Sequence, residues 1–81
     1  MRFAPRISDE DIIDAIRDLG YVATLPTIMR LISARYNVED SNPEMKSIVR
    51  NQIYRRVNSL AKFRILIRTG QKGDYKYRIE E

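Results

Sequence analysis

The chain has 81 residues, carries a formal net charge of +4, and contains neither Cys nor His. A chain this short is expected to form one domain over residues 1–81, with a thin core that buries only about 60% of the unfolded surface. The missing Cys and His exclude disulfides and remove the usual zinc ligands. Acid–base catalysis near neutral pH usually relies on His. We therefore expect no catalytic activity and no bound cofactor.

Charge is distributed unevenly along the chain. Residues 1–40 hold five Lys or Arg against seven Asp or Glu, whereas residues 41–81 hold ten against four. A basic half is typical of a surface that binds nucleic acid or an anionic membrane, although solubilising charge has the same composition. The chain has no run of about 18 apolar residues, so no membrane-spanning helix is expected. The start MRFAPRISDED lacks the apolar segment of a signal peptide, and a cytoplasmic protein is expected.

The run ISDEDIIDAIRDLG has the signals of a helix start and a helix end, and predicts a helix over residues 8–19. Ser8 is the expected N-cap, and Asp11 closes a capping box. Ile7 and Ile12 are expected to form a hydrophobic staple across this start. The acidic residues of the first turn suit the positive end of the helix dipole, which explains them better than a metal site does.

A short extended stretch and a second helix follow. YVAT, residues 21–24, predicts a single strand at the edge of a sheet. The next run, LPTIMRLISARYN, predicts a helix over residues 25–36, because Pro26 is tolerated only in a first helical turn.

The third predicted helix carries the most informative pattern. It opens at SNPEM, where either Asn42 or Ser41 can provide the N-cap. At about 100° per residue, an apolar stripe faces the core; its members are Met45, Val49, Ile53, Val57 and Leu60. Arg56 also falls on this stripe, so its stem is expected to pack while its charged head reaches solvent. The opposite face is polar, with basic residues on its flanks; it carries Ser47, Asn51, Tyr54 and Asn58, flanked by Arg50, Arg55 and Lys62.

The C-terminal run RILIRTGQKGDYKYRIEE predicts a β-hairpin. Its strands are expected over residues 65–69 and 74–79, joined by a glycine-bracketed turn. Tyr75 and Tyr77 share one face of the second strand, where packing on the core is favoured over stacking on single-stranded bases. Both faces of the first strand are partly apolar, so the register of the hairpin stays open.

The order helix, strand, helix, helix, strand, strand resembles the winged helix-turn-helix superfamily over residues 8–80. The stretch IYRRVNSLAKFRILIR is similar to the end of the recognition helix of that family and its passage into the wing. Many members have Gly in this link, where this chain has Phe63 and Arg64. The resemblance implies an α+β fold with three helices, a short strand and a C-terminal hairpin wing. It also implies that the third helix enters the major groove of DNA, with the wing on an adjacent groove or on the phosphate backbone.

The residue types on the third helix and the wing agree with this implication. Asn can pair bidentately with adenine and Arg with guanine, and hydroxyl groups commonly donate to phosphates. Asn is also a mediocre helix former, so two Asn on an exposed face have no evident structural purpose. The candidate DNA-binding residues are Lys46, Ser47, Arg50, Asn51, Tyr54, Arg55, Asn58, Arg68, Gln71, Lys72 and Lys76.

The expected function is therefore double-stranded DNA binding by a transcriptional regulator. Two alternatives stay open, because a fold does not fix a function. One is a protein-interaction module that uses the same fold inside a larger assembly, and the other is an RNA or single-stranded DNA binder. A homodimer would extend the DNA site; it would use the first helix, the segment of residues 1–6, or the surface of the second helix.

Overall fold

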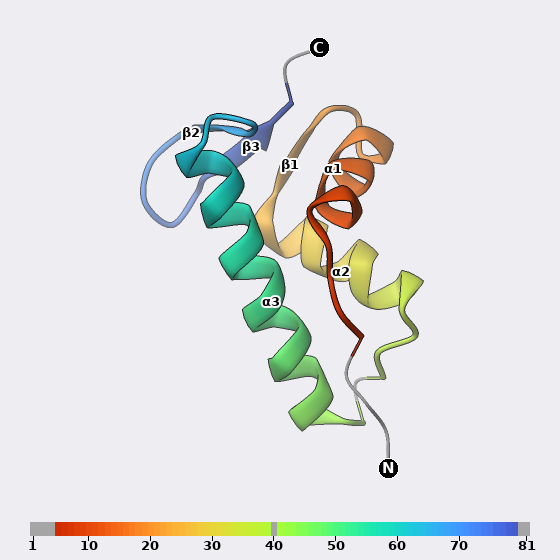
Figure 1. The fold of residues 1–81 in the computed structure, drawn as a ribbon. Coiled ribbons are helices and arrows are strands. Elements are labelled where there is room, and N and C mark those ends of the chain that lie inside the picture. Colours follow the sequence, from red (N-terminus) through yellow and green to blue (C-terminus); the bar gives the residue numbers. More distant parts are fainter. Residues whose placement is uncertain (1–4, 40, 80–81) are drawn as a thin grey trace.

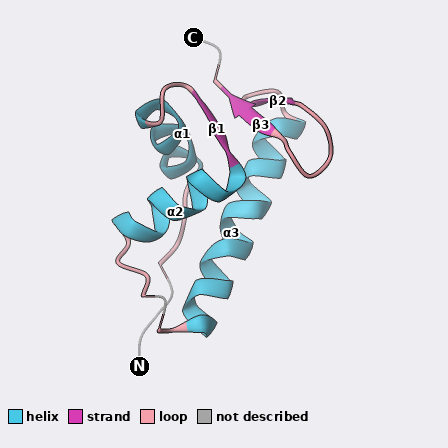
Figure 2. Ribbon diagram, turned by 180° about the vertical axis from the view of Figure 1, so that it is seen from behind, coloured by secondary structure: helices cyan, strands magenta, loops and turns pink. Residues whose placement is uncertain are grey.

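The computed structural model describes residues 5–39 and 41–79, in which three helices pack beside a three-stranded antiparallel sheet (Figure 1). The fold is α+β, and the sheet has the strand order β1-β3-β2 (Figure 2). The predicted order of elements is confirmed, with β1 at an edge of the sheet. In chain order the elements are α1 (Asp9–Asp18), β1 (Val22–Thr24), α2 (Leu25–Arg35), α3 (Pro43–Lys62), β2 (Ile67–Thr69) and β3 (Lys76–Arg78).

The start of α1 has the capping box that its sequence predicts. The Ser8 hydroxyl accepts from the Asp11 backbone N–H at 3.1 Å, and the Asp11 carboxylate accepts from the Ser8 N–H at 2.9 Å. Ile7 and Ile12, the expected staple, are both fully buried. These reciprocal bonds satisfy backbone groups that a helix start would otherwise leave without partners.

The start of α3 resolves the choice between its two possible caps. The Asn42 side-chain oxygen accepts from the Met45 N–H at 3.1 Å, and Pro43 is the first helical residue. The Ser41 hydroxyl instead donates to the Glu39 carboxylate at 3.2 Å. Proline is tolerated at this first position because its missing N–H has no intrahelical partner there.

All three helices end with a residue in the left-handed backbone region, and the third of these residues is unusual. The residues are Gly20 (φ +96°), Asn37 (φ +56°) and Arg64 (φ +61°). After Arg64, the Ile65 N–H donates to the Leu60 carbonyl at 2.9 Å, which is the long bond of a Schellman motif. Arg64 therefore closes α3 in the link to the wing, in a conformation that Gly adopts without steric cost.

Both strands of the hairpin are shorter than predicted, and the first starts late because the end of α3 uses its first backbone donors. The Ile65 and Leu66 N–H groups both donate to the Leu60 carbonyl, at 2.9 and 3.1 Å, so they do not join the ladder. In the ladder Arg68 lies opposite Tyr77. This register puts Arg68 on the same face of the sheet as the buried Tyr77, and settles the choice that the sequence left open.

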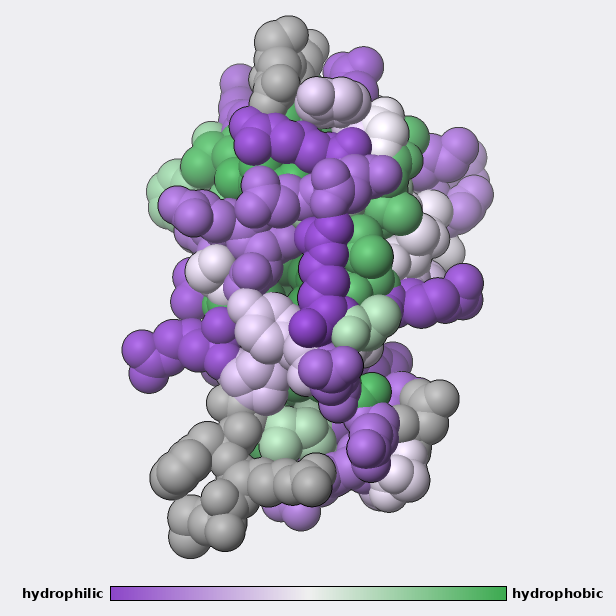
Figure 3. Space-filling model, turned by 90° about the vertical axis from the view of Figure 1, so that its right-hand side faces the viewer, coloured by the Kyte–Doolittle hydropathy of each residue, from purple (hydrophilic) through white to green (hydrophobic). Residues whose placement is uncertain are grey.

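The core lies between α3, the other two helices and the inner face of the sheet. Four members of the predicted α3 stripe are buried, and Met45 at its N-terminal end is half-buried. From the side of α1 and α2, polar side chains cover most of the surface and apolar atoms show between them (Figure 3). The buried residues are Ile7, Ile12, Ala15, Ile16, Ala23, Ile28, Ile32, Val49, Ile53, Val57, Leu60, Leu66 and Tyr77.

The positive φ at the end of α3 gives a first prediction. Arg64→Gly should raise the free energy of unfolding by about 0.5–1 kcal/mol, because the left-handed strain it relieves exceeds the entropy that Gly adds to the unfolded chain. Urea denaturation followed by circular dichroism measures the change. Gly20→Ala is the matched control: nothing lies within 4 Å of its added Cβ, yet its positive φ should make it destabilising. A loss of stability in Arg64→Gly would contradict this account of the helix end.

Asp11 and Tyr36 link the stability of the fold to pH. The Tyr36 hydroxyl donates to the Asp11 carboxylate at 2.6 Å. Burial by itself would raise the pKa of Asp11, but hydrogen bonds with Ser8 and Tyr36 bring that pKa below its ordinary value. The same bond to Asp11, followed by burial, raises the pKa of Tyr36.

Tyr36→Phe should reduce the dependence of stability on pH at both ends of the range. A carboxyl group whose pKa is lowered by folding stabilises the fold above its unfolded pKa, and this stabilisation is lost as pH falls through the folded pKa. A tyrosine whose pKa is raised stabilises below about pH 10, and this stabilisation is lost as pH rises through the folded pKa. Urea midpoints below about pH 4 and above about pH 10 should therefore fall more steeply for the wild type. Parallel curves for the two proteins would contradict the role of this bond.

Candidate nucleic-acid interface

The exposed side of α3 faces away from the rest of the helices. Because the apolar stripe of α3 packs toward α1 and α2, the opposite side is left to solvent, with Ser47, Asn51 and Tyr54 exposed and Asn58 half-buried. The loop between β2 and β3, residues 70–75, projects on this same side of the molecule (Figures 1 and 2). The exposed side of α3 and the wing loop therefore face the same side of the molecule.

Tyr54 is the centre of this surface. Its side chain is 53% exposed and lines three neighbouring hollows. The hollow toward the start of α3 also includes Ser47, Arg50 and Asn51. We call these three hollows and the side chains around them the α3–wing surface; beyond Tyr54, the two hollows toward the wing include Asn58, Lys62, Arg64, Arg68 and Lys72.

The structure brings seven of the eleven candidate residues into the lining of these hollows: Ser47, Arg50, Asn51, Tyr54, Asn58, Arg68 and Lys72. Lys46 and Arg55 are exposed on α3, and Gln71 is exposed at the wing tip, but none of them lines one of these three hollows. Lys76 is exposed and neighbours the buried Tyr77 on β3. Side chains alternate along a strand, so Lys76 lies on the outer face of the sheet, away from the α3–wing surface.

Two basic residues join the surface that the sequence did not place among the candidates. Lys62 was expected only on the flank of the third helix, and Arg64 only in the link, yet both line the hollow beside β2. The left-handed backbone at Arg64 redirects the chain at this point. The sequence held one signal for this placement of Arg64. It is a basic residue in the link where many members of the resembled family have Gly.

The wing has an internal contact that fixes one of its basic residues. The Arg68 guanidinium carbon lies 4.8 Å from the centre of the Tyr75 ring. A cation over an aromatic face at this distance is attracted by the ring quadrupole. Tyr75 is itself half-buried against the core, so the contact holds the Arg68 head beside the hollow.

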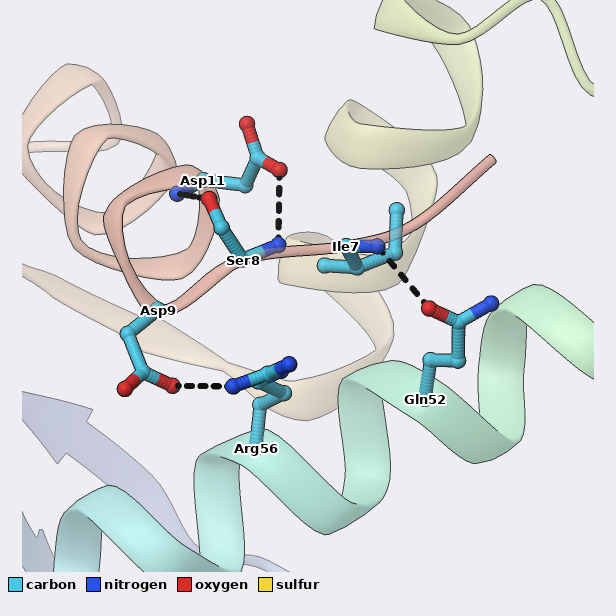
Figure 4. A network of polar contacts seen from close by, with 6 residues as sticks. All are labelled: Ile7, Ser8, Asp9, Asp11, Gln52 and Arg56. Carbon is cyan, nitrogen blue, oxygen red and sulfur yellow. Dashed lines mark hydrogen bonds and ion pairs between the residues drawn. The ribbon is translucent and has the colours of Figure 1, made fainter.

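Polar residues on another side of α3 hold the N-terminal segment instead. The Gln52 side-chain oxygen accepts from the Ile7 N–H at 2.8 Å, and its amide donates to the Pro5 carbonyl at 2.8 Å. One turn further on, Arg56 meets the Asp9 carboxylate at 3.3 Å (Figure 4). Arg56 is half-buried, and its charged head reaches the acidic first turn of α1.

Two of the three residues in the acidic run at the start of α1 are accounted for by these contacts. Asp9 pairs with Arg56, and Asp11 closes the capping box. Among residues 5–39 and 41–79, no group of three or more His, Cys, Asp or Glu is placed to hold a metal ion. The described helices also include none with the length and apolar character needed to cross a membrane.

Substitution of Gln52 should lower the free energy of unfolding more than substitution of its neighbour Asn51. Gln52→Ala removes two partly buried hydrogen bonds and leaves the Ile7 N–H without a partner, so it should lower the free energy of unfolding by about 1–3 kcal/mol. Asn51→Ala, at an exposed position, should change it by less than about 0.5 kcal/mol. Urea denaturation of both variants checks this, and equal effects would contradict the structural role of Gln52.

Comparison of the chain with protein-family models, with curated proteins and with solved structures finds no match. Inferences about function therefore rest on the chemistry and arrangement of α3 and the wing.

Proposed function

We propose that this chain is a winged helix-turn-helix protein that binds double-stranded DNA, acting as a transcriptional regulator. In this proposal α3 enters the major groove, and the hairpin of β2 and β3 is the wing that contacts an adjacent groove or the phosphate backbone. One observation carries it: basic and amide side chains of α3 and the wing meet around Tyr54 in a continuous exposed surface.

The charge distribution supports the same orientation. The exposed side of α3 and the wing carries Arg50, Arg55, Lys62 and Lys72. The acidic first turn of α1 packs against another side of α3, where Asp9 meets Arg56, and not against the exposed polar face. A molecule with this polarity approaches a polyanion with its α3–wing surface forward, because charged surfaces steer association.

The dimensions of α3 suit a major groove. Its 20 residues give a rod about 30 Å long, and a helix of about 10–12 Å diameter fits a groove about 12 Å wide. Asn51 and Arg55 are one turn apart on the exposed side, so both can reach base edges from a helix lying in that groove. Lys72 at the wing then lies beyond the groove and suits phosphate contact.

A protein-interaction role is the second candidate, and exposed apolar side chains favour it. Phe63 is 70% exposed, Ile65 50% and Val22 43%, and none of the three lines the hollows around Tyr54. Such residues suit a contact with another protein or a second copy of the chain. Of the dimer surfaces considered from the sequence, residues 1–4 of the N-terminal segment lie outside the described residues. Sedimentation with Phe63→Ser would detect a dimer that depends on this region.

Duplex binding should depend steeply on salt. If about four to six basic residues contact phosphates, log K should fall with log[salt] at a slope of about −4 to −5. Fluorescence anisotropy with duplexes selected from a random pool, measured at several salt concentrations, gives the slope and the preferred sequence together. Affinity for duplex DNA that does not change with salt would refute the proposal.

Substitutions should separate base contacts from phosphate contacts. Asn51→Ala and Arg55→Ala should each weaken binding to the selected sequence by about 1–3 kcal/mol, with a smaller effect on random duplex. Lys72→Ala should weaken both about equally and make the salt slope shallower by about one unit. Arg17→Ala removes the same charge from α1, outside the α3–wing surface, and should bind as the wild type does. Unchanged affinities for Asn51→Ala on both duplexes would rule out base reading at that position.

A further inference from the structure

We propose that the hollow between α3 and the wing holds one unpaired nucleotide, so that the protein prefers duplex DNA with an extrahelical base over perfectly paired duplex. This inference rests on the proposed DNA-binding function and names a second ligand element within the same surface. It concerns the open hollow of about 570 Å³ that α3, the wing and the start of α2 border. Its chemistry differs from that of the rest of the α3–wing surface.

The hollow has the size and lining of a small-ligand site. Its volume falls in the range of about 300–1,000 Å³ that is usual for such sites, which are mostly apolar with a few polar groups. Tyr54, Tyr75 and Leu25 supply aromatic and aliphatic walls. A paired base inside a duplex stack does not present its faces to such walls, whereas an extrahelical base does.

The exposed aromatic wall suits base stacking. Tyr54 projects from α3 with half of its side chain in solvent, and no described hydrogen bond involves its ring hydroxyl. Across the lining, Arg68 already lies over Tyr75, and guanidinium planes stack on bases as aromatic rings do. Aromatic stacking on a single base contributes affinity without requiring a particular sequence.

The polar groups of the lining suit a base edge with its own phosphate nearby. Asn58 offers a side-chain donor and an acceptor, and Asp74 offers an acceptor for an exocyclic amino group. These are the groups that pair with a Watson–Crick edge, which is free only in an unpaired base. Lys72, at the rim, supplies a cation for the adjoining phosphate. A phosphate alone would not be matched by the Asp74 carboxylate, so the nucleotide base is the part that the hollow fits.

The test compares two duplexes of one sequence, one fully paired and one with a single bulged nucleotide at its centre. Anisotropy titrations with the full chain should give about tenfold tighter binding to the bulged duplex. Tyr54→Leu keeps an apolar side chain at an exposed position but removes the stacking ring, so the ratio of the two affinities should fall to about one. Tyr21→Leu, at a 47% exposed tyrosine outside the hollow, should leave the ratio unchanged.

The outcomes distinguish this inference from the proposed function. Equal affinities of the wild type for the two duplexes would overturn the inference and leave duplex binding intact. A preference that Tyr54→Leu retains would overturn the hollow as the binding place, since a bulge also makes DNA easier to bend. Failure to bind either duplex would overturn the inference together with the proposed function.

Discussion

Burial of the apolar stripe of α3 is the constraint on which the rest of the structure depends. Val49, Ile53, Val57 and Leu60 are almost completely removed from solvent, and each such side chain contributes about 1.5–3 kcal/mol on burial. In a domain this small those contributions are a large share of the net stability. They fix the rotation of the helix about its axis, because rotation in either direction would expose the stripe. The polar side of α3 is exposed as a consequence.

Contacts along the edge of the apolar stripe fix the position of α3 relative to the N-terminal segment and α1. Gln52 holds the backbone of Pro5 and Ile7, and Arg56 reaches Asp9. The ion pair is exposed, so it contributes less than about 1 kcal/mol. The Gln52 bonds matter more, because they satisfy backbone groups of a segment that lies outside any helix or strand. One polar edge of α3 thus stabilises the fold, and the opposite polar face takes no part in these contacts.

The end of α3 then determines where the wing lies. Arg64 accepts a left-handed conformation, Leu60 receives two backbone donors, and Leu66 is the first wing residue to enter the core. Strained backbone of this kind persists where the surrounding structure determines it, and it often borders functional sites. Here it places Arg68 and the wing loop against the C-terminal half of α3. The resulting hollow joins residues that lie at least ten positions apart in the chain, such as Asn58 and Arg68.

The sequence by itself determined the helices, the capping box of α1 and the inward face of α3, because these depend on residues three or four positions apart. Ser8 with Asp11, and Val49 with Ile53, are such local pairs. It did not determine the hairpin register, the structural role of Gln52 as opposed to the exposure of Asn51, or the hollow around Tyr54. Those features depend on which distant backbone groups and side chains meet, as when Gln52 meets Pro5 or Arg68 lies opposite Tyr77. Only the tertiary structure decides them, because packing of the whole core sets the positions of both partners.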